Sequence, residues 1–358
     1  MPHSDHDRNG VGFYKMTEEQ FYNSLNLIEE GDYKKLEALR NRFESWSTAW
    51  RNLPEKQKQL FNPEEEWEKM AGLSIKLVLR ESSAYPPLLK EISHPPFGVY
   101  FLGSLPQKED VILAIVGTRK ATSDGRELAK KFASELAQSG VIVISGLALG
   151  IDAAAHEGCV QGGRRTVAVL GSGLDYFYPR TNARLAEKIL SQKGTIISEY
   201  PLGSPPLPYR FLERNRIISG LARGVLVIEA PERSGALVTA GFAVEQNREV
   251  FVVPGPATHP NFAGSHKLIR AGAELVTKPG EILETLGLAS KTTESRIKAA
   301  ETVEEKKILE VLKDFSVPVT IDRIIELTDL GASEANQVLT FLIIKNIVKE
   351  TDGGYTIN

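Results

Sequence analysis

The stretch VILAIVGTR at residues 111–119 joins an uninterrupted apolar run to a glycine turn, and this combination recurs along the middle of the chain. Similar runs begin at Val141, Thr166, Val225 and Glu249 and are separated by segments of helical length. Continuous Val/Ile runs bounded by turns are typical of parallel strands buried on both faces. The β–α alternation from 111 to 286 predicts an α/β fold with a doubly wound parallel sheet and right-handed crossovers.

The turns after parallel strands share one edge of such a sheet, where ligands bind. Glycines there allow backbone N–H groups to approach an anion, so we expect a ligand that carries phosphate. A dinucleotide is disfavoured because Tyr176 stands where a G-x-G-x-x-G fingerprint starting at Gly171 needs glycine. The strand at 141–145 also ends in Ser145 rather than in an acidic residue that could bind a ribose. No cofactor is therefore expected.

Composition narrows the class of protein. A length of 358 residues predicts two or three domains, and a single cysteine, Cys159, argues against a disulfide framework. No apolar stretch approaches the roughly 18 residues of a membrane span, so we expect a cytoplasmic protein without membrane attachment. The net charge is −3. Basic residues outnumber acidic ones only in 106–288, which permits a local basic groove rather than a uniformly basic surface.

Four segments are expected from the change of pattern along the chain. Residues 1–104 contain short helices, beginning with a capping box at Thr17–Gln20, and a proline-rich connector. The sheet domain follows at 105–288 and a polar linker at 289–302. Residues 303–358 show three helical patterns and a terminal hairpin, which is winged-helix order.

Two basic segments are candidate anion-binding sites. Arg119 and Lys120 lie in the turn after the first strand, at the expected ligand edge. Residues 209–216 combine two aromatic residues, three arginines and an asparagine at the entry to a helix, a composition suited to phosphate binding and base stacking. Arg214 and Arg216 are about 200° apart on a helix, so we expect one of them to pair with a carboxylate such as Glu229 or Asp175.

The sequence indicates catalysis or metal binding less strongly than it indicates anion binding. His156 and Cys159 share a helical face, but no further Cys or helical His completes a metal set, and Cys159 is expected to be buried. Small residues at 234–239 would allow close approach of a ligand. An enzyme alternative remains open, a nucleotide-processing hydrolase of the N-glycosidase type that uses Glu245 or Glu199 as acid–base group. A pure assembly scaffold is a third alternative.

Taken together, these motifs resemble the DprA/Smf family, the DNA-processing proteins of natural transformation. The matching blocks stand in family order over about 170 residues: 117–119, 145–156, 171–175, 178–179, 198–199, 214–221, 229–230, 234–240, 254–255, 268–269 and 272–273. The sequence departs from the common pattern at Leu212, where the family usually has proline, and at His266, where it usually has asparagine.

The resemblance implies a non-enzymatic protein that binds single-stranded DNA without strong sequence preference and loads a RecA-type recombinase during DNA uptake, competence and recombination. It also implies an extended Rossmann-like domain with a mostly parallel sheet, a SAM-like N-terminal domain, a winged helix and a homodimer, and it admits a single-strand-binding protein as a partner. The DNA-binding candidates, from the residues and the resemblance together, are Gly117, Thr118, Arg119, Lys120, Gly146, Gly171, Ser172, Gly173, Arg210, Phe211, Arg214, Asn215, Arg216, Ser234 and Gly235.

The expected winged helix has few cations for reading duplex DNA. Its third helix offers Glu334, Asn336, Gln337 and Thr340, with Lys345 as its cation. A helix that enters a DNA groove normally carries more Arg or Lys. We therefore expect this domain to bind protein or to regulate.

Overall fold

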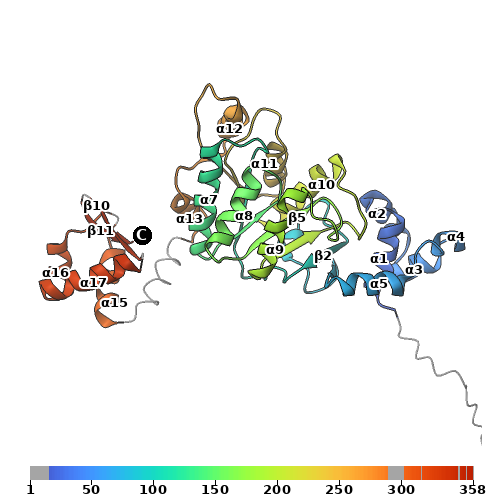
Figure 1. Cartoon of the computed structure of the whole chain (residues 1–358), viewed down its shortest axis with the longest axis horizontal. Coiled ribbons are helices and arrows are strands. Elements are labelled where there is room, and N and C mark those ends of the chain that lie inside the picture. Colours follow the sequence, from blue (N-terminus) through green and yellow to red (C-terminus); the bar gives the residue numbers. More distant parts are fainter. Residues whose placement is uncertain (1–15, 289–301, 316, 346, 352, 358) are drawn as a thin grey trace, which may run out of the picture. The chain divides into compact units, whose positions relative to one another are not determined.

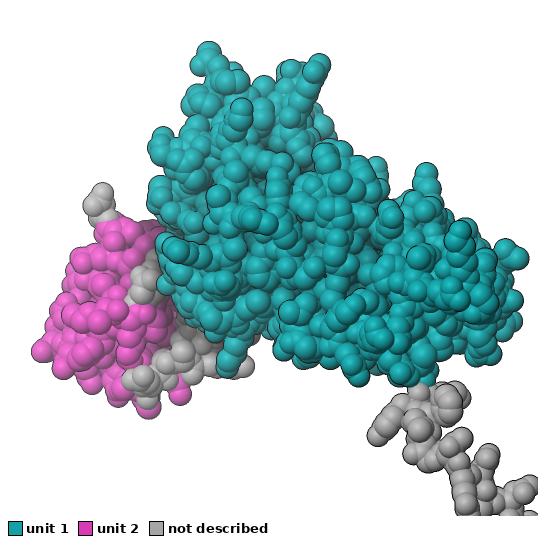
Figure 2. Space-filling model, turned by 45° about the vertical axis from the view of Figure 1, so that its right-hand side comes forward, with its two compact units in different colours: residues 1–277 teal, residues 278–358 magenta. Residues whose placement is uncertain are grey.

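The computed structural model describes residues 16–288, 302–315, 317–345, 347–351 and 353–357. Two compact units divide the chain, residues 1–277 and 278–358 (Figure 2). Most of the expected linker, residues 289–301, lies outside the described residues. No helix in the described ranges is long and apolar enough to cross a membrane.

The first unit begins with five helices: α1 (Glu18–Ile28), α2 (Tyr33–Arg42), α3 (Trp46–Arg51), α4 (Glu55–Lys58) and α5 (Pro63–Gly72). The expected capping box is present, because the Thr17 hydroxyl accepts from the Gln20 N–H and the Gln20 side chain accepts from the Thr17 N–H. Aromatic and aliphatic residues of these helices pack with Phe97 and Tyr100 in one apolar core.

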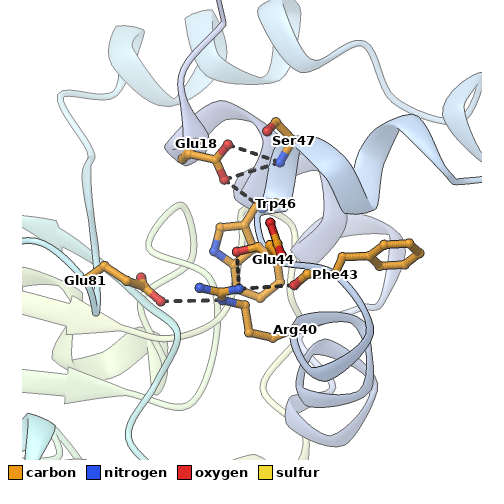
Figure 3. A network of polar contacts seen from close by, with 7 residues as sticks. All are labelled: Glu18, Arg40, Phe43, Glu44, Trp46, Ser47 and Glu81. Atoms are coloured by element: carbon orange, nitrogen blue, oxygen red, sulfur yellow. Dashed lines mark hydrogen bonds and ion pairs between the residues drawn. The ribbon is translucent and has the colours of Figure 1, made fainter.

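Polar contacts join the same helices (Figure 3). The Glu18 carboxylate accepts from the N–H groups of Trp46, at 2.7 Å, and Ser47, at the N-terminus of α3. Arg40 donates to the carbonyls of Phe43 and Glu44, and its Nε lies 3.6 Å from the Glu81 carboxylate. A carboxylate at a helix N-terminus satisfies N–H groups that have no partner within the helix. A guanidinium near a helix C-terminus does the same for carbonyl groups.

A nine-stranded sheet forms the centre of this unit, in the order β1-β2-β6-β5-β4-β3-β7-β8-β9 (Figure 1). The strands are β1 (Lys76–Leu79), β2 (Gly98–Leu102), β3 (Ile112–Val116), β4 (Ile142–Ser145), β5 (Thr166–Leu170), β6 (Thr195–Ser198), β7 (Gly224–Val227), β8 (Glu249–Val252) and β9 (Glu274–Leu275). Along the sheet from β6 through β5, β4, β3, β7 and β8 to β9, every neighbouring pair of strands is parallel. The five strands numbered β3 to β7 are buried along their whole length. The expected mostly parallel, doubly wound fold is confirmed.

The sheet begins earlier than expected. β2 adds antiparallel to β6 and β1 pairs antiparallel with β2 at the edge, so the start near residue 105 was wrong. These strands have four and five residues and stand among prolines, a pattern without the long apolar run that marks a central strand. The boundary after residue 104 therefore does not separate helices from sheet, although the division into domains stays a prediction.

Helices cover both faces of the sheet. One layer consists of α7 (Ser123–Gln138), α8 (Ile151–Gln161) and α9 (Ala183–Ser191), which pack side by side (Figure 1). In the other layer, α10 (Pro208–Leu221) packs against α11 (Gly235–Glu245) and the short α6 (Pro87–Lys90). Short 3₁₀ turns at Arg180–Asn182 and Pro260–Phe262 precede α9 and α12 (Ala263–Arg270).

The second unit contains α13 (Pro279–Thr285), α15 (Val303–Lys313), α16 (Ile321–Thr328), α17 (Ala332–Ile344), β10 (Val348–Thr351) and β11 (Gly354–Ile357). The last three helices and the hairpin enclose an apolar core of their own. The order of these elements is the one that the sequence predicts, and the assignment as a winged helix stays a prediction. Lys345, the expected cation of the third helix, forms an ion pair with Glu305 at 2.8 Å.

Candidate functional site

The strand order reverses direction between β3 and β7, and a cavity of about 300 Å³ lies at the carboxyl ends of these two strands. This is the switch point at which doubly wound sheets bind ligands. The turns after β3, β4 and β7 and the helices α8, α10 and α11 supply its lining: Val116, Gly117, Thr118, Arg119, Ala148, Asp152, Pro208, Phe211, Leu212, Arg214, Asn215, Ile218, Pro231, Arg233, Ser234, Gly235, Ala236 and Thr239.

Many of the sequence-predicted residues meet there. The cavity is lined by Gly117, Thr118, Arg119, Phe211, Arg214, Asn215, Ser234 and Gly235. A smaller hollow of about 50 Å³ shares Arg119 and Phe211 and adds Gly146 and Tyr178. Lys120 is exposed next to Arg119. Gly171, Ser172, Gly173, Arg210 and Arg216 line neither hollow.

Arg119 and Phe211 form the accessible surface of the site. The guanidinium carbon of Arg119 lies 5.3 Å from the centre of the Phe211 ring, and the Tyr178 ring lies 5.4 Å from Phe211 on a tilted plane. Arg119 is exposed and forms no ion pair with any carboxylate in the described part of the chain. A free guanidinium beside partly exposed aromatic rings can bind a phosphate and stack against a base.

Arg214 is a different kind of arginine. Its guanidinium donates to the Gly146 carbonyl at 2.9 Å and to the Val169 carbonyl. Burial lowers the pKa of Arg214 to about 10, and burial also raises the pKa of Asp152 although Arg214 opposes that rise. Asp152 accepts from the Gly146 N–H at 3.1 Å. Both buried side chains line the cavity, and both bond to Gly146 in the segment after β4.

Arg210 and Arg216 bind other parts of the protein than the cavity. Arg210 donates to the carbonyls of Glu30 and Pro205 and lies 4.7 Å above the Tyr200 ring. Arg216 pairs with Glu199 at 2.8 Å, so the expected pairing of one arginine is confirmed but the partners named, Glu229 and Asp175, were wrong. Both arginines are buried, and their charges hold α10 against the N-terminal helices and β6 rather than face the cavity.

The turn at 171–173 is hydrogen-bonded to other residues of the protein. Ser172 is buried and its hydroxyl donates to the Tyr176 carbonyl at 3.1 Å, while Ser198 donates to the Ser172 carbonyl at 2.7 Å. The Gly173 N–H donates to the Ser204 carbonyl at 3.0 Å. These groups are bonded within the chain and are not available to a ligand in this arrangement.

Glu229 occupies the N-terminus of α7, where an anion could otherwise bind. Its buried carboxylate accepts from the Thr122 N–H at 3.1 Å and from Asn261 at 2.8 Å, and its backbone carbonyl accepts from the Thr118 N–H at 2.8 Å. Glu229 therefore holds the turn after β3 in place. The positive charge that this turn offers to a ligand comes from Arg119 rather than from the N-terminus of α7.

The sequence did not lead us to Arg233 or Asp152 as cavity residues. Arg233 is exposed at the cavity and Thr239 is buried beside it. A signal was present, because Arg233 stands in the glycine turn that follows β7, the partner of β3 at the switch point. Choosing it required the strand order, which the sequence alone leaves open.

The residues proposed for catalysis lie elsewhere. Glu199 is paired with Arg216, and Glu245 is exposed on α11 outside the cavity lining. Cys159 is fully buried, as expected, and burial raises the pKa of its thiol to about 12. Among the described residues, no group of His, Cys, Asp and Glu side chains could hold a metal ion. No observation at the cavity favours the hydrolase alternative.

The fold and the cavity define a doubly wound α/β protein whose ligand site combines exposed guanidinium groups with aromatic rings. The family model of DNA recombination-mediator protein A matches residues 76–287, more than half of the chain, and the chain belongs to this family. The match includes β1 and β2, the strands that the sequence analysis missed.

Relatives and solved structures agree with this assignment. Protein Smf of Escherichia coli is 48% identical over 210 residues, which are 59% of this chain and 56% of that protein. DNA processing protein DprA of Streptococcus pneumoniae is 40% identical over 218 residues, 61% of this chain and 75% of that protein. The matched part thus spans little more than half of the E. coli relative.

The X-ray structure of DprA from S. pneumoniae superposes with a TM-score of 0.61 at 33% identity and covers 75% of this chain and 98% of that chain. A Helicobacter pylori DprA structure has a TM-score of 0.53 at 28% identity and covers 59% of this chain and 95% of that chain. The H. pylori structure concerns the single-stranded DNA binding mode of that protein.

Proposed function

We propose that this protein binds single-stranded DNA at the β3–β7 cavity and delivers it to a RecA-type recombinase. The observation that carries the proposal is the free, exposed Arg119 guanidinium against the Phe211 ring, at the switch point of the sheet. Arg233 supplies a second exposed cation at the same cavity. Membership in a family of recombination mediators and the single-stranded DNA binding of the H. pylori protein support this choice of ligand.

The expected chemistry has two parts. Arg119, with Lys120 and Arg233 nearby, would neutralise backbone phosphates, and Phe211 with Tyr178 would offer ring faces to bases. Stacking on an aromatic side chain contributes about 1–3 kcal/mol per base and tolerates any sequence. Thr118, Asn215, Ser234 and Gly235 line the cavity as polar and small neighbours of the strand.

Arg119→Ala tests the assignment. Each phosphate released from contact makes the log–log salt dependence for a single strand shallower by about 0.7, which corresponds to about fivefold in affinity at ~0.1 M salt. We expect both changes for oligothymidylate in a fluorescence anisotropy titration over a range of salt concentrations.

Arg51→Ala is the matched control, because Arg51 is also an exposed arginine but lies on α3. It should leave both the affinity and the slope unchanged. If Arg119→Ala binds oligothymidylate like the wild type, the DNA strand binds elsewhere on the protein.

Recombinase delivery and the proposed homodimer go beyond DNA binding. Filament assembly by a RecA-type recombinase on single strands should be faster with the wild-type protein than with Arg119→Ala, and solution mass should correspond to two chains. The C-terminal unit is proposed to bind protein, since Lys345 on α17 already pairs with Glu305. The same anisotropy titration with duplex DNA should then show weaker binding than with single strands.

A further inference from the structure

A second hollow of about 380 Å³ lies between α8 and α9, the neighbouring helices labelled in Figure 1. It is lined by Glu157, Val160, Gln161, Thr181, Asn182, Arg184, Leu185 and Lys188. None of these residues belongs to the β3–β7 cavity or to the DNA-binding candidates of the sequence analysis. The hollow therefore needs its own explanation.

Unpaired positive charge lines this hollow. Arg184 and Lys188 are four residues apart on α9, so they lie on the same helical face, and both are exposed. Neither forms an ion pair with a carboxylate among the residues that the structure describes. The carboxylate of the lining, Glu157, is already paired with Lys130 at 3.2 Å. Gln161 and Thr181 are exposed and add hydrogen-bonding groups.

The segment at 178–182 connects this hollow with the rim of the sheet. Tyr178 and Pro179 line the small hollow that contains Arg119 and Phe211, whereas Thr181 and Asn182 line the α8–α9 hollow. Four residue steps span at most about 14 Å. Asn182 is fixed by a hydrogen bond to the Leu147 carbonyl at 2.8 Å, so the connecting turn is anchored to the segment after β4.

We propose that a single strand bound at the β3–β7 cavity continues past Tyr178 into the α8–α9 hollow, where Arg184 and Lys188 bind two further backbone phosphates. This inference rests on the proposed function, because it extends the footprint of the same polyanion. Three observations support the proposal: residues within 178–182 line both hollows, Arg184 and Lys188 have no carboxylate partner among the described residues, and Asn182 anchors the connecting turn. The site takes the sugar-phosphate backbone, without preference for sequence.

The double variant Arg184→Ala/Lys188→Ala tests the extension with oligothymidylates of about 6, 12 and 24 nucleotides, a range that covers typical single-strand site sizes. A strand too short to reach the second hollow should bind the variant and the wild type equally. The longer strands should lose about 5- to 25-fold in affinity at ~0.1 M salt, and the slope of their salt dependence should fall by about 1.4.

The control variant Lys34→Ala/Lys56→Ala removes two exposed cations from α2 and α4 and should match the wild type at every length. Circular dichroism and the unfolding midpoint check that each variant is folded. Arg119→Ala, in contrast, should weaken binding of the short strand as well.

Three results would overturn the extension. If the double variant binds long strands with the wild-type affinity and slope, no phosphates lie at Arg184 and Lys188. If it loses short and long strands equally, the two residues do not form an added site. If the wild type binds none of the strands, the proposed function fails and the extension fails with it.

Discussion

Two glycine turns lie at the same edge of the sheet but have different surroundings. The turn at Gly117–Arg119 lines the β3–β7 cavity and ends in an exposed arginine. The turn at Gly171–Gly173 lines neither rim hollow, and the Ser172 hydroxyl, the Ser172 carbonyl and the Gly173 N–H bond to Tyr176, Ser198 and Ser204. Turns of similar sequence can thus serve a ligand site in one case and the protein interior in the other.

The need for glycine does not distinguish the two turns from each other. A Cβ atom on Gly117 would lie 2.5 Å from the Ile151 side chain, and one on Gly173 would lie 2.7 Å from the Pro201 carbonyl oxygen. In both turns glycine is required because another part of the protein approaches closely. What distinguishes the first turn is the charged residue that follows and the open space next to it.

Arg214 lines the cavity beside the first turn and bonds the strand that leads into the second, so its removal should have the largest effect. It donates to the carbonyls of Gly146 and Val169, the second just before the 171–173 turn, and it compensates Asp152 in the cavity lining. Its removal leaves two carbonyls without their donor and the buried Asp152 carboxylate without the nearby positive charge of Arg214, and such a loss costs about 3–5 kcal/mol. We expect Arg214→Ala to lower the free energy of unfolding in urea by about that amount.

Asp152→Asn in the Arg214→Ala background provides the check. Removing the second charge should restore part of the lost stability if the unpaired carboxylate is the cause. A single variant that unfolds at the wild-type urea concentration would contradict the structural role of Arg214.

The second prediction concerns α8, the helix whose residue Ile151 packs against Gly117. His156 is fully buried on this helix, with Nδ1 at 2.9 Å from the Thr166 hydroxyl, and burial lowers its pKa to about 3. In the unfolded chain the imidazole titrates near pH 6.5. The unfolded state therefore binds more protons between these two values, and His156 lowers the stability as the pH falls from about 6.5 to about 3.

At pH 5 this effect should amount to about 2 kcal/mol relative to neutral pH. Urea unfolding of the wild type and of His156→Gln at pH 7 and pH 5 measures it, since the variant lacks the titrating group. The difference between the two proteins should shrink at pH 5. A constant difference would mean that His156 is accessible to protons in the folded state.

The fold was largely predictable because five central strands are continuous apolar runs, a local pattern. β1 and β2 were not, since such short strands resemble loops in the sequence and are defined by their pairing, β2 with β6 and β1 with β2. Arg119 was also predictable, because its position after the first strand fixes it at the ligand edge.

The burial of the other arginines was not predictable. Arg210, Arg214 and Arg216 stand within seven residues of one helix, and all three are buried. Their partners, such as Glu30 and Glu199, come from distant parts of the chain. A cluster of arginines beside an aromatic residue suggests a nucleic-acid site, but the same residues also suit a helix that joins two layers. Only the packing of α10 decides between them.

The smallest effect should distinguish the two turns directly. Ser172→Ala removes the hydroxyl that donates to the Tyr176 carbonyl and should lower the free energy of unfolding by about 0.5–1.5 kcal/mol. Because this turn lies outside the β3–β7 cavity, affinity for oligothymidylate should change less than twofold. Thr118→Ala is the matched change in the first turn, where the hydroxyl accepts from the Lys120 N–H at 3.2 Å and the residue lines the cavity.

Thr118→Ala should therefore weaken DNA binding at a similar loss of stability, because it frees the turn that positions Arg119. Thermal unfolding and anisotropy titrations on the same samples separate the two quantities. If Ser172→Ala weakened binding more than Thr118→Ala, the strand would contact the second turn, which would then have to open when DNA binds, since its polar groups are bonded within the protein.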